Sequence, residues 1–218
     1  MRIPIGILAA VGLLTSISAA HAMTITIWTG SGLPLDAQAA APPATELGVY
    51  AYNGPIDFVN NNPQGGSNTF GDFFGPTYSH DLSWISGASI SSLLATTMSV
   101  DGNGTTTYLQ ITGNYSTGTA FSGTITHDDG AGLYLNGSSS SILDNPAGQP
   151  GCDQQQSTET CSFTIQPGSG TFELAYTEDN GAPAVLQATI PTPEPASLAI
   201  FASGLLGLTL LQRRRQRG

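Results

Sequence analysis

The sequence predicts an all-β protein body that folds as a single antiparallel β-sandwich, with an apolar segment at each end of the chain. Short runs alternate apolar and polar residues at period two, as in residues 24–29. These runs recur about every eight to twelve residues between glycine and asparagine turns, which is typical of sandwiches and barrels. Signals for helices are weak and fall in one segment. We therefore expect a sandwich, of jelly-roll or related topology.

The first 22 residues are predicted to form a secretory signal peptide. Arg2 precedes an apolar run over residues 3–17, and Ala20 and Ala22 supply the small-x-small pattern of a cleavage site. Cleavage after Ala22 would make Met23 the first residue of the mature chain. We therefore exclude this N-terminal apolar helix from the folded body.

The C-terminal segment is predicted to be a short transmembrane helix. Residues 196–211 carry no charge, and an arginine-rich end, residues 212–218, follows with Arg213, Arg214, Arg215 and Arg217. Sixteen helical residues reach about 24 Å, less than the roughly 30 Å hydrocarbon core, so flanking residues must help the helix to span. The arginines favour a cytoplasmic location for this end. The body is therefore expected on the other side of the membrane.

A proline-rich linker precedes this apolar segment. Pro193, Glu194 and Pro195 favour an extended, unpaired backbone that a processing enzyme could grip. The order of this tripeptide, an apolar helix and an arginine cluster, over residues 192–218, resembles the PEP-CTERM sorting signal read by exosortases. The resemblance implies transient residence in the inner membrane, cleavage by an exosortase-type enzyme, and a role at the cell surface in exopolysaccharide or biofilm. An ordinary tail anchor with a proline linker is the alternative.

The remaining residues, 23–191, are long enough for one domain with its own core, and we call them the body. All five basic residues lie in the terminal segments, whereas the body keeps 14 of the 15 acidic residues, all except Glu194. Without a cation to neutralise phosphate, the body is not expected to bind nucleic acid or anionic lipid. Divalent cations and neutral sugars remain as partners. Alternatively, the acidity only keeps an exported protein soluble.

The two cysteines, Cys152 and Cys161, lie nine positions apart in the body. In an exported chain they are predicted to form one disulfide, which would stabilise the fold by roughly 2–3 kcal/mol in the loop-entropy model. No histidine pair lies nearby, so a zinc site is not expected.

The first half of the body is expected to contain few strands. Residues 24–29 form the first strand, residues 30–46 a long loop, and residues 47–52 and 55–59 two short strands that can pair with each other. Residues 60–75 are predicted as a loop. The three phenylalanine side chains of this loop could stack on sugar rings, but we favour the interpretation that they cover the hydrophobic core. Residues 81–94 have near-helical spacing and could form one short helix. The phenylalanines are Phe70, Phe73 and Phe74.

The second half has more regular strand signals. A turn at residues 101–104 is superficially like a calcium loop, but its twelfth position is Thr112 rather than glutamate, so an EF-hand is excluded. The predicted strands are residues 105–112, 119–126, 133–136, 139–143, 161–165, 171–176 and 184–190.

The densest functional pattern is a pair of adjacent carboxylates, Asp128 and Asp129, after the strand of residues 119–126. Like charges repel unless a cation lies between them, and hard oxygen ligands on a loop suit calcium. The alternative is a structural turn in which the aspartates accept hydrogen bonds from backbone amides. His127 could act as a base, but no nucleophile accompanies it. We therefore do not expect an enzyme.

Residues 126–136, together with residues 172–176, 178–181 and 184–190, resemble the protective-antigen type (PA-fourteen) β-sandwich of adhesins. The resemblance implies that Asp128 and Asp129 bind calcium and that the ion holds sugar hydroxyls. Two function classes stay open at this point: a calcium-assisted glycan-binding module and a passive structural coat or matrix protein without a ligand site.

Overall fold

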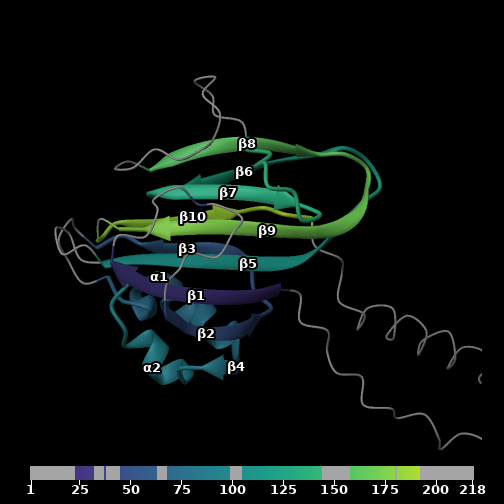
Figure 1. Ribbon diagram of the computed structural model, residues 1–218. Coiled ribbons are helices and arrows are strands. Elements are labelled where there is room, and N and C mark those ends of the chain that lie inside the picture. Colours follow the sequence, from purple (N-terminus) through teal and green to yellow (C-terminus); the bar gives the residue numbers. More distant parts are fainter. Residues whose placement is uncertain are drawn as a thin grey trace, which may run out of the picture. The chain divides into compact units, whose positions relative to one another are not determined.

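The structure is a computed structural model that describes residues 23–31, 37, 45–62, 68–98, 105–143, 158–179 and 181–191 (Figure 1). All of these residues belong to one unit of the chain, His21–Pro193. Its elements, in chain order, are β1 Met23–Ser31, β2 Thr45–Tyr52, β3 Ile56–Asn60, α1 Phe70–Tyr78, the 3-10 turn η1 Ser79–Asp81, β4 Leu82–Gly87, α2 Ile90–Leu94, β5 Thr105–Thr117, β6 Phe121–His127, β7 Gly130–Leu135, β8 Glu159–Ile165, β9 Gly168–Glu178 and β10 Ala184–Ala188.

The strands form two antiparallel sheets, which confirms the predicted all-β class. The larger sheet has the order β4-β2-β1-β5-β9-β7 and the smaller one the order β3-β10-β6-β8. Every pairing between named strands is antiparallel. Strand connections therefore cross repeatedly between the sheets, as from β2 to β3 and from β6 to β7.

The core lies between the inner faces of the two sheets. Alternation places Ile25 and Ile27 of β1, Ile111 of β5 and Phe163 of β8 inside, while their neighbours in sequence face outward. A second, smaller apolar cluster lies on the outer face of the larger sheet, around Trp28, Tyr108 and Tyr134. Burying both sets of side chains gives the sandwich its hydrophobic stabilisation.

The helix α1 corrects the prediction of a loop over residues 60–75. Thr69 and Asp72 form a capping box: the Asp72 amide donates to Thr69 Oγ1 and the Thr69 amide to Asp72 Oδ2, both at 3.1 Å. The favoured interpretation of the three phenylalanines is confirmed, because Phe70, Phe73 and Phe74 are all fully buried. They pack in the core from a helix rather than from a loop.

Three further predictions about local structure are wrong. Residues 47–52 and 55–59 become strands, but β2 pairs with β1 and β4 whereas β3 pairs with β10 in the other sheet. Residues 81–94 do not form one helix but the edge strand β4 and the short helix α2. No strand forms over residues 139–143, although the Ile142 amide donates to the Leu133 carbonyl at 2.8 Å beside β7.

Several terminal predictions fall outside the described residues: the signal peptide with its cleavage after Ala22, the sorting tripeptide, the apolar segment 196–211 and the arginine cluster. Within the described ranges, no helix is long and apolar enough to cross a membrane.

Both ends of the body lie at the same end of the sandwich. Met23, which begins β1, pairs with Gly113 of β5. The carbonyl of Pro191 accepts a hydrogen bond from the amide of Ser116, also in β5, at 3.1 Å. Figure 1 shows the start of β1 and the end of β5 together at the right-hand end.

Candidate functional site

The acidic pair lies in the tight connection between β6 and β7, at the opposite end of the sandwich from Met23. Asp128 and Asp129 are 7% and 1% exposed, although carboxylates are normally solvated. Asp129 has a left-handed backbone conformation, with φ of 63°, which aspartate tolerates better than most residues. The strand ends therefore place two carboxylates inside the protein rather than on its surface.

Protein donors hold both carboxylates. Asp128 accepts hydrogen bonds from the Asp129 amide at 3.0 Å and from the Thr158 hydroxyl at 3.1 Å. Asp129 Oδ2 accepts from the amide of Asp179 at 2.6 Å. These contacts match the structural-turn interpretation of the acidic pair.

Two more acidic residues approach this turn from the end of β9. Glu178 is 1% exposed and accepts a hydrogen bond from the buried Tyr176 hydroxyl at 2.9 Å. Asp179 accepts from Thr106 at 2.6 Å. Burial and the nearby charges of Glu178, Asp129 and Asp128 hold the pKa of Tyr176 far above its ordinary value, so this tyrosine stays protonated and donates.

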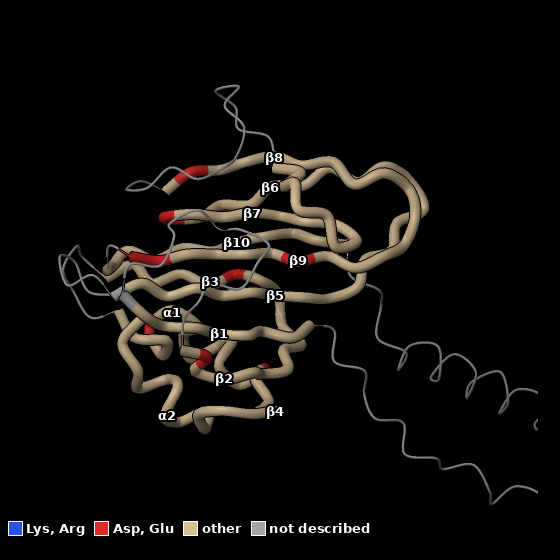
Figure 2. The backbone as a smooth tube through the Cα atoms, in the orientation of Figure 1, with Lys and Arg blue, Asp and Glu red and all other residues tan. Residues whose placement is uncertain are grey.

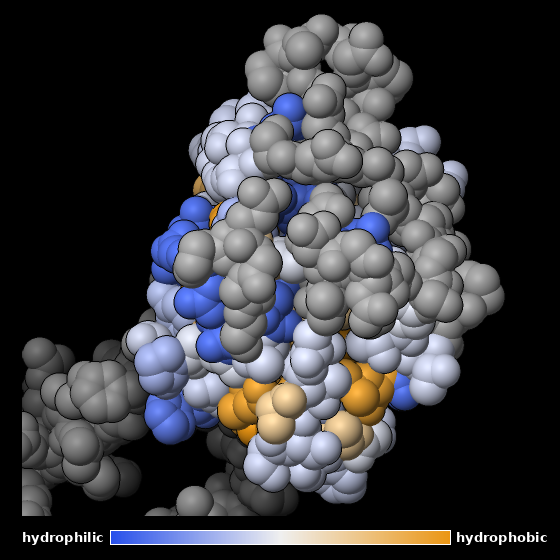
Figure 3. Space-filling model, turned by 90° about the vertical axis from the view of Figure 1, so that its left-hand side faces the viewer, coloured by the Kyte–Doolittle hydropathy of each residue, from blue (hydrophilic) through white to orange (hydrophobic). Residues whose placement is uncertain are grey.

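The body contains no lysine or arginine that could balance these carboxylates. Figure 2 shows acidic positions at the left-hand ends of β7, β8 and β9, and others elsewhere on both sheets. Figure 3, which looks onto that left-hand end, shows hydrophilic patches there. Buried carboxylates without a cation are costly, which makes this end the best candidate for binding a metal ion.

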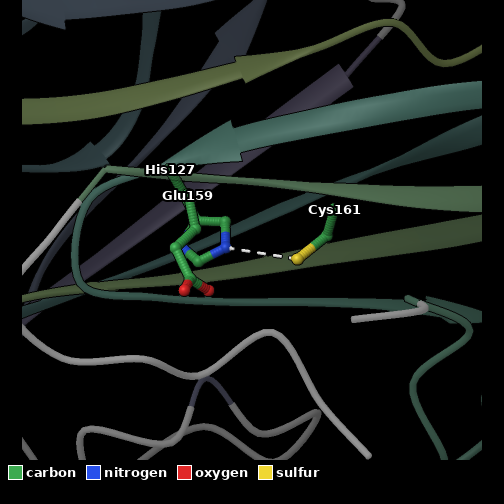
Figure 4. Close-up of side chains that lie close together, drawn as sticks. All are labelled: His127, Glu159 and Cys161. Carbon is green, nitrogen blue, oxygen red and sulfur yellow. Dashed lines mark hydrogen bonds between the residues drawn. The ribbon is translucent and has the colours of Figure 1, made fainter. Parts of the chain in front are cut away.

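A trio of side chains lies beside the acidic turn: the buried His127 and Cys161 and the partly buried Glu159 (Figure 4). Their possible ligand atoms all lie within 4.8 Å of one another, and the described residues contain no other such group of three. His127 Nδ1 lies 2.7 Å from the carbonyl of Asp129, so it carries the proton and donates. Nε2 lies 3.9 Å from Cys161 Sγ.

A zinc ion at this trio would require Cys161 as a thiolate, but the described part of the chain contains no free cysteine. Burial lowers the pKa of His127, against the opposing effects of the Asp129 carbonyl and nearby carboxylates, so the imidazole stays neutral. We assign His127 a structural role, in which its N–H group holds the Asp129 carbonyl and thus the acidic turn.

Sequence reasoning identified Asp128 and Asp129 but missed the residues that surround them. Thr158, Glu159 and Asp179 are 30 to 50 positions away along the chain, and only strand register brings them close. One signal was visible beforehand, because Glu178 and Asp179 lie two and three residues after the predicted strand of residues 171–176. Cys152 lies outside the described residues, so its disulfide with Cys161 stays a prediction.

A surface groove lies apart from the acidic turn. It is a shallow groove of about 450 Å³ on the outer face of the larger sheet, lined by residues that include Met23, Thr24, Thr112, Asn114 and Glu173. Glu173 Oε1 is buried without a hydrogen-bond partner. Burial raises the pKa of Glu173, although a hydrogen bond from Gln110 opposes this shift.

Replacing Glu173 with glutamine is expected to stabilise the body at neutral pH. A carboxyl with a raised folded-state pKa contributes stability below its unfolded pKa, and this stability is lost as the pH rises through the folded pKa. Because partial exposure to solvent screens this carboxylate, Glu173→Gln should gain at most about 1 kcal/mol at pH 7 and little near pH 4. Urea denaturation at both pH values measures this, with Glu46→Gln at an exposed position as control. A loss of stability at pH 7 would contradict the prediction.

Comparisons with known proteins identify the C-terminal segment. Residues 191–215 match the model of the PEP-CTERM protein-sorting motif, which confirms the predicted sorting signal. The comparison with curated proteins finds no match.

Among solved structures, the chain is similar to the PA14 domain of the antifreeze protein MpAFP, at 15% identity and a TM-score of 0.47, covering 80% of this chain and 83% of that one. It is also similar to a PA14 sugar-binding domain from an RTX adhesin, at 16% identity and a TM-score of 0.44, covering 78% and 90%. These neighbours are of the domain type that the sequence resembles. The sorting motif implies an exported protein whose C-terminus is anchored in the membrane before sorting.

Proposed function

We propose that this protein is an exported cell-surface or matrix component whose body binds calcium at Asp128 and Asp129 and, through that ion, a polysaccharide. The observation that carries the proposal is that Asp128, Asp129 and Glu178 are each buried in a body without lysine or arginine. Calcium accepts carboxylate and carbonyl oxygens in flexible geometries and would balance this charge. No catalytic role is proposed, because the sulfur next to His127, Cys161 Sγ at 3.9 Å from Nε2, is not a free thiol.

Delivery follows from the sorting motif. We propose that the signal peptide is removed after Ala22, that the tail holds the precursor transiently in the inner membrane, and that an exosortase-type enzyme cleaves near Pro193–Pro195. The body is then released or attached among exopolysaccharide or biofilm material, with Cys152 and Cys161 joined in a disulfide. Mass spectrometry of surface-associated protein tests this, because an intact Gly218 on most molecules would exclude processing.

Calcium is expected to raise the melting temperature of the processed body. At a hundredfold excess over the dissociation constant, a ligand that binds only the folded state adds about 2.7 kcal/mol of stability. For a domain of this size the melting temperature should rise by about 5–10 °C. Differential scanning calorimetry with calcium, and with chelator, measures the shift.

The double variant D128N/D129N should lose most of this shift, because asparagine offers neutral and weaker oxygen ligands. Glu46→Gln, which changes an exposed carboxylate at the same end, should keep it. A shift of equal size in all three proteins would place calcium elsewhere, and no shift in the unaltered body would end the proposal. A glycan array with and without chelator then tests whether the body binds a polysaccharide and whether this binding requires calcium.

The second candidate is a passive coat or matrix protein. It is favoured by the hydrogen bonds that Asp128 and Asp129 already accept from Thr158 and from backbone amides. This candidate predicts no heat of calcium binding in calorimetry and no binding on a glycan array. It also predicts altered mechanics of the matrix when the protein is absent.

A further inference from the structure

The body has two unlike ends along the direction of its strands. At one end, which we call the exit end, Met23 pairs with Gly113 and Pro191 binds Ser116. The two contacts are three residues apart on β5, or about 10 Å. Both boundaries of the body, the one after the signal peptide and the one before the sorting motif, therefore emerge side by side.

The carboxylates concentrate at the other end, which we call the acidic end. Thr107 of β5 pairs with Glu178, nine residues from Ser116 along the same strand. This separation corresponds to about 30 Å. The acidic end carries Glu46, Asp128, Asp129, Glu159, Glu178 and Asp179.

The exposed positions that the structure describes near the two boundaries are uncharged: Asn114, Ser116, Asn136, Ser138 and Ser169. Among the described residues, three carboxylates lie in this half of the body, namely Asp57, Asp81 and Glu173, and each is partly buried. Of these, Glu173 lines the same groove as Met23. Contact with an anionic lipid surface is therefore opposed less at this end than at the acidic end.

The linker between the body and the predicted apolar segment is too short for the acidic end to reach the bilayer. Four residues, 192–195, separate Pro191 from the predicted apolar segment, and they can span at most about 14 Å. The linker therefore cannot run the roughly 30 Å along the sandwich to bring the acidic end to the bilayer.

We propose that the anchored precursor meets the bilayer surface with its exit end, so that the acidic end points away from the membrane. The inference rests on the proposed membrane anchor but not on calcium or sugar binding. At about 30 Å the acidic end lies several Debye lengths, of about 8 Å each, from the lipid headgroups. A cation or polysaccharide can then reach it before the tail is cleaved.

The body contains no lysine, so an introduced lysine is its single reactive side chain for an amine-reactive reagent, and peptide mass spectrometry separates it from the N-terminal amine of the chain. We would compare Ser169→Lys at the exit end with Thr45→Lys at the acidic end, both at exposed positions. The tail-bearing chain is placed in vesicles of phosphatidylethanolamine and phosphatidylglycerol without other proteins. An anionic, impermeant reagent is added, and peptide mass spectrometry gives the labelling rate at each lysine, in vesicles and after solubilisation in neutral detergent.

Ser169→Lys should react roughly three- to sevenfold more slowly in vesicles than in detergent, since a surface potential of about −30 to −50 mV depletes a monovalent anion by this factor. The labelling rate of Thr45→Lys should differ less than about twofold between vesicles and detergent, because this lysine lies more than a Debye length from the lipid headgroups. Ser138→Lys provides a second exit-end site if Ser169→Lys fails to fold. Equal slowing at both ends, or slowing at Thr45→Lys alone, would overturn the proposal.

Flotation of the vesicles distinguishes a failure of the membrane anchor from a failure of the proposed orientation. Protein that does not float with lipid is not anchored, which would contradict the proposed delivery and remove the basis of this orientation. Protein that floats but shows no protection at the exit end refutes the orientation alone. Protection seen only in cells, and not in these vesicles, would mean that a protein rather than the bilayer covers the exit end, and would also refute it.

Discussion

Replacing Phe58 with alanine is expected to lower the free energy of unfolding of the body by about 3–5 kcal/mol. Phe58 is fully buried in β3, and its ring packs against four other aromatic rings with centroids 4.9–6.3 Å away. They belong to Tyr52, Phe73, Phe74 and Tyr78. Truncation would open a cavity where the smaller sheet, β2 and α1 meet, and these rigid elements cannot collapse to fill it.

Urea denaturation of the processed body measures this loss, and Phe121→Ala serves as the matched control. Phe121 is only partly buried and contacts one aromatic ring, that of Phe163, at 6.1 Å. Its truncation should cost clearly less than that of Phe58. Similar losses for both variants would show that the aromatic cluster around Phe58 is not the centre of the core.

The strands of the fold were predictable where the sequence alternates at period two. In β1, Ile25 and Ile27 alternate with threonines, and this pattern determines directly which face is buried. Partner choice was not predictable in the same way. The chain between Tyr52 and Ile56 contains Gly54 and Pro55, which could form a hairpin turn but instead connect one sheet to the other. Only packing against the second sheet decides between these outcomes.

The segments that were predicted wrongly carry conflicting local signals. In α1, Gly75 has a φ of 64° and Pro76 follows it, so composition favours a loop, whereas the capping box and three buried phenylalanines favour a helix. In β4 the apolar spacing suits a helix, but pairing with β2 satisfies the backbone instead. Gly87 fits there because any β-carbon would lie 2.4 Å from the Gly48 backbone.

The candidate site was predictable only in its central pair. Asp128 and Asp129 are adjacent in sequence and follow a strand, so a pattern search finds them. Their donors, Thr158 and the Asp179 amide, lie directly before β8 and directly after β9, and antiparallel register brings these strand ends to the turn. A one-residue shift in register would turn these groups to the other face, which is why spacing along the chain could not reveal them.

Asp129→Ala is expected to cost about 2–4 kcal/mol of stability, because two separate effects add. Alanine in the left-handed conformation of Asp129 costs roughly 1–2 kcal/mol. Removing the carboxylate also leaves the amide of Asp179 without its 2.6 Å acceptor, which costs about 1–3 kcal/mol more. Chemical denaturation without calcium measures the total.

Asp129→Asn separates the structural role of this residue from a metal-binding role. Asparagine tolerates the left-handed conformation and keeps an oxygen that can accept from the Asp179 amide, so we expect it to cost less than about 1 kcal/mol. If calcium binds here, this stable variant should still lose most of the stabilisation by calcium, because a neutral oxygen replaces a charged ligand. If the turn is only structural, both variants should behave identically with calcium and with chelator. An Asp129→Ala variant as stable as Asp129→Asn would instead show that the hydrogen bond to Asp179 does not hold the turn.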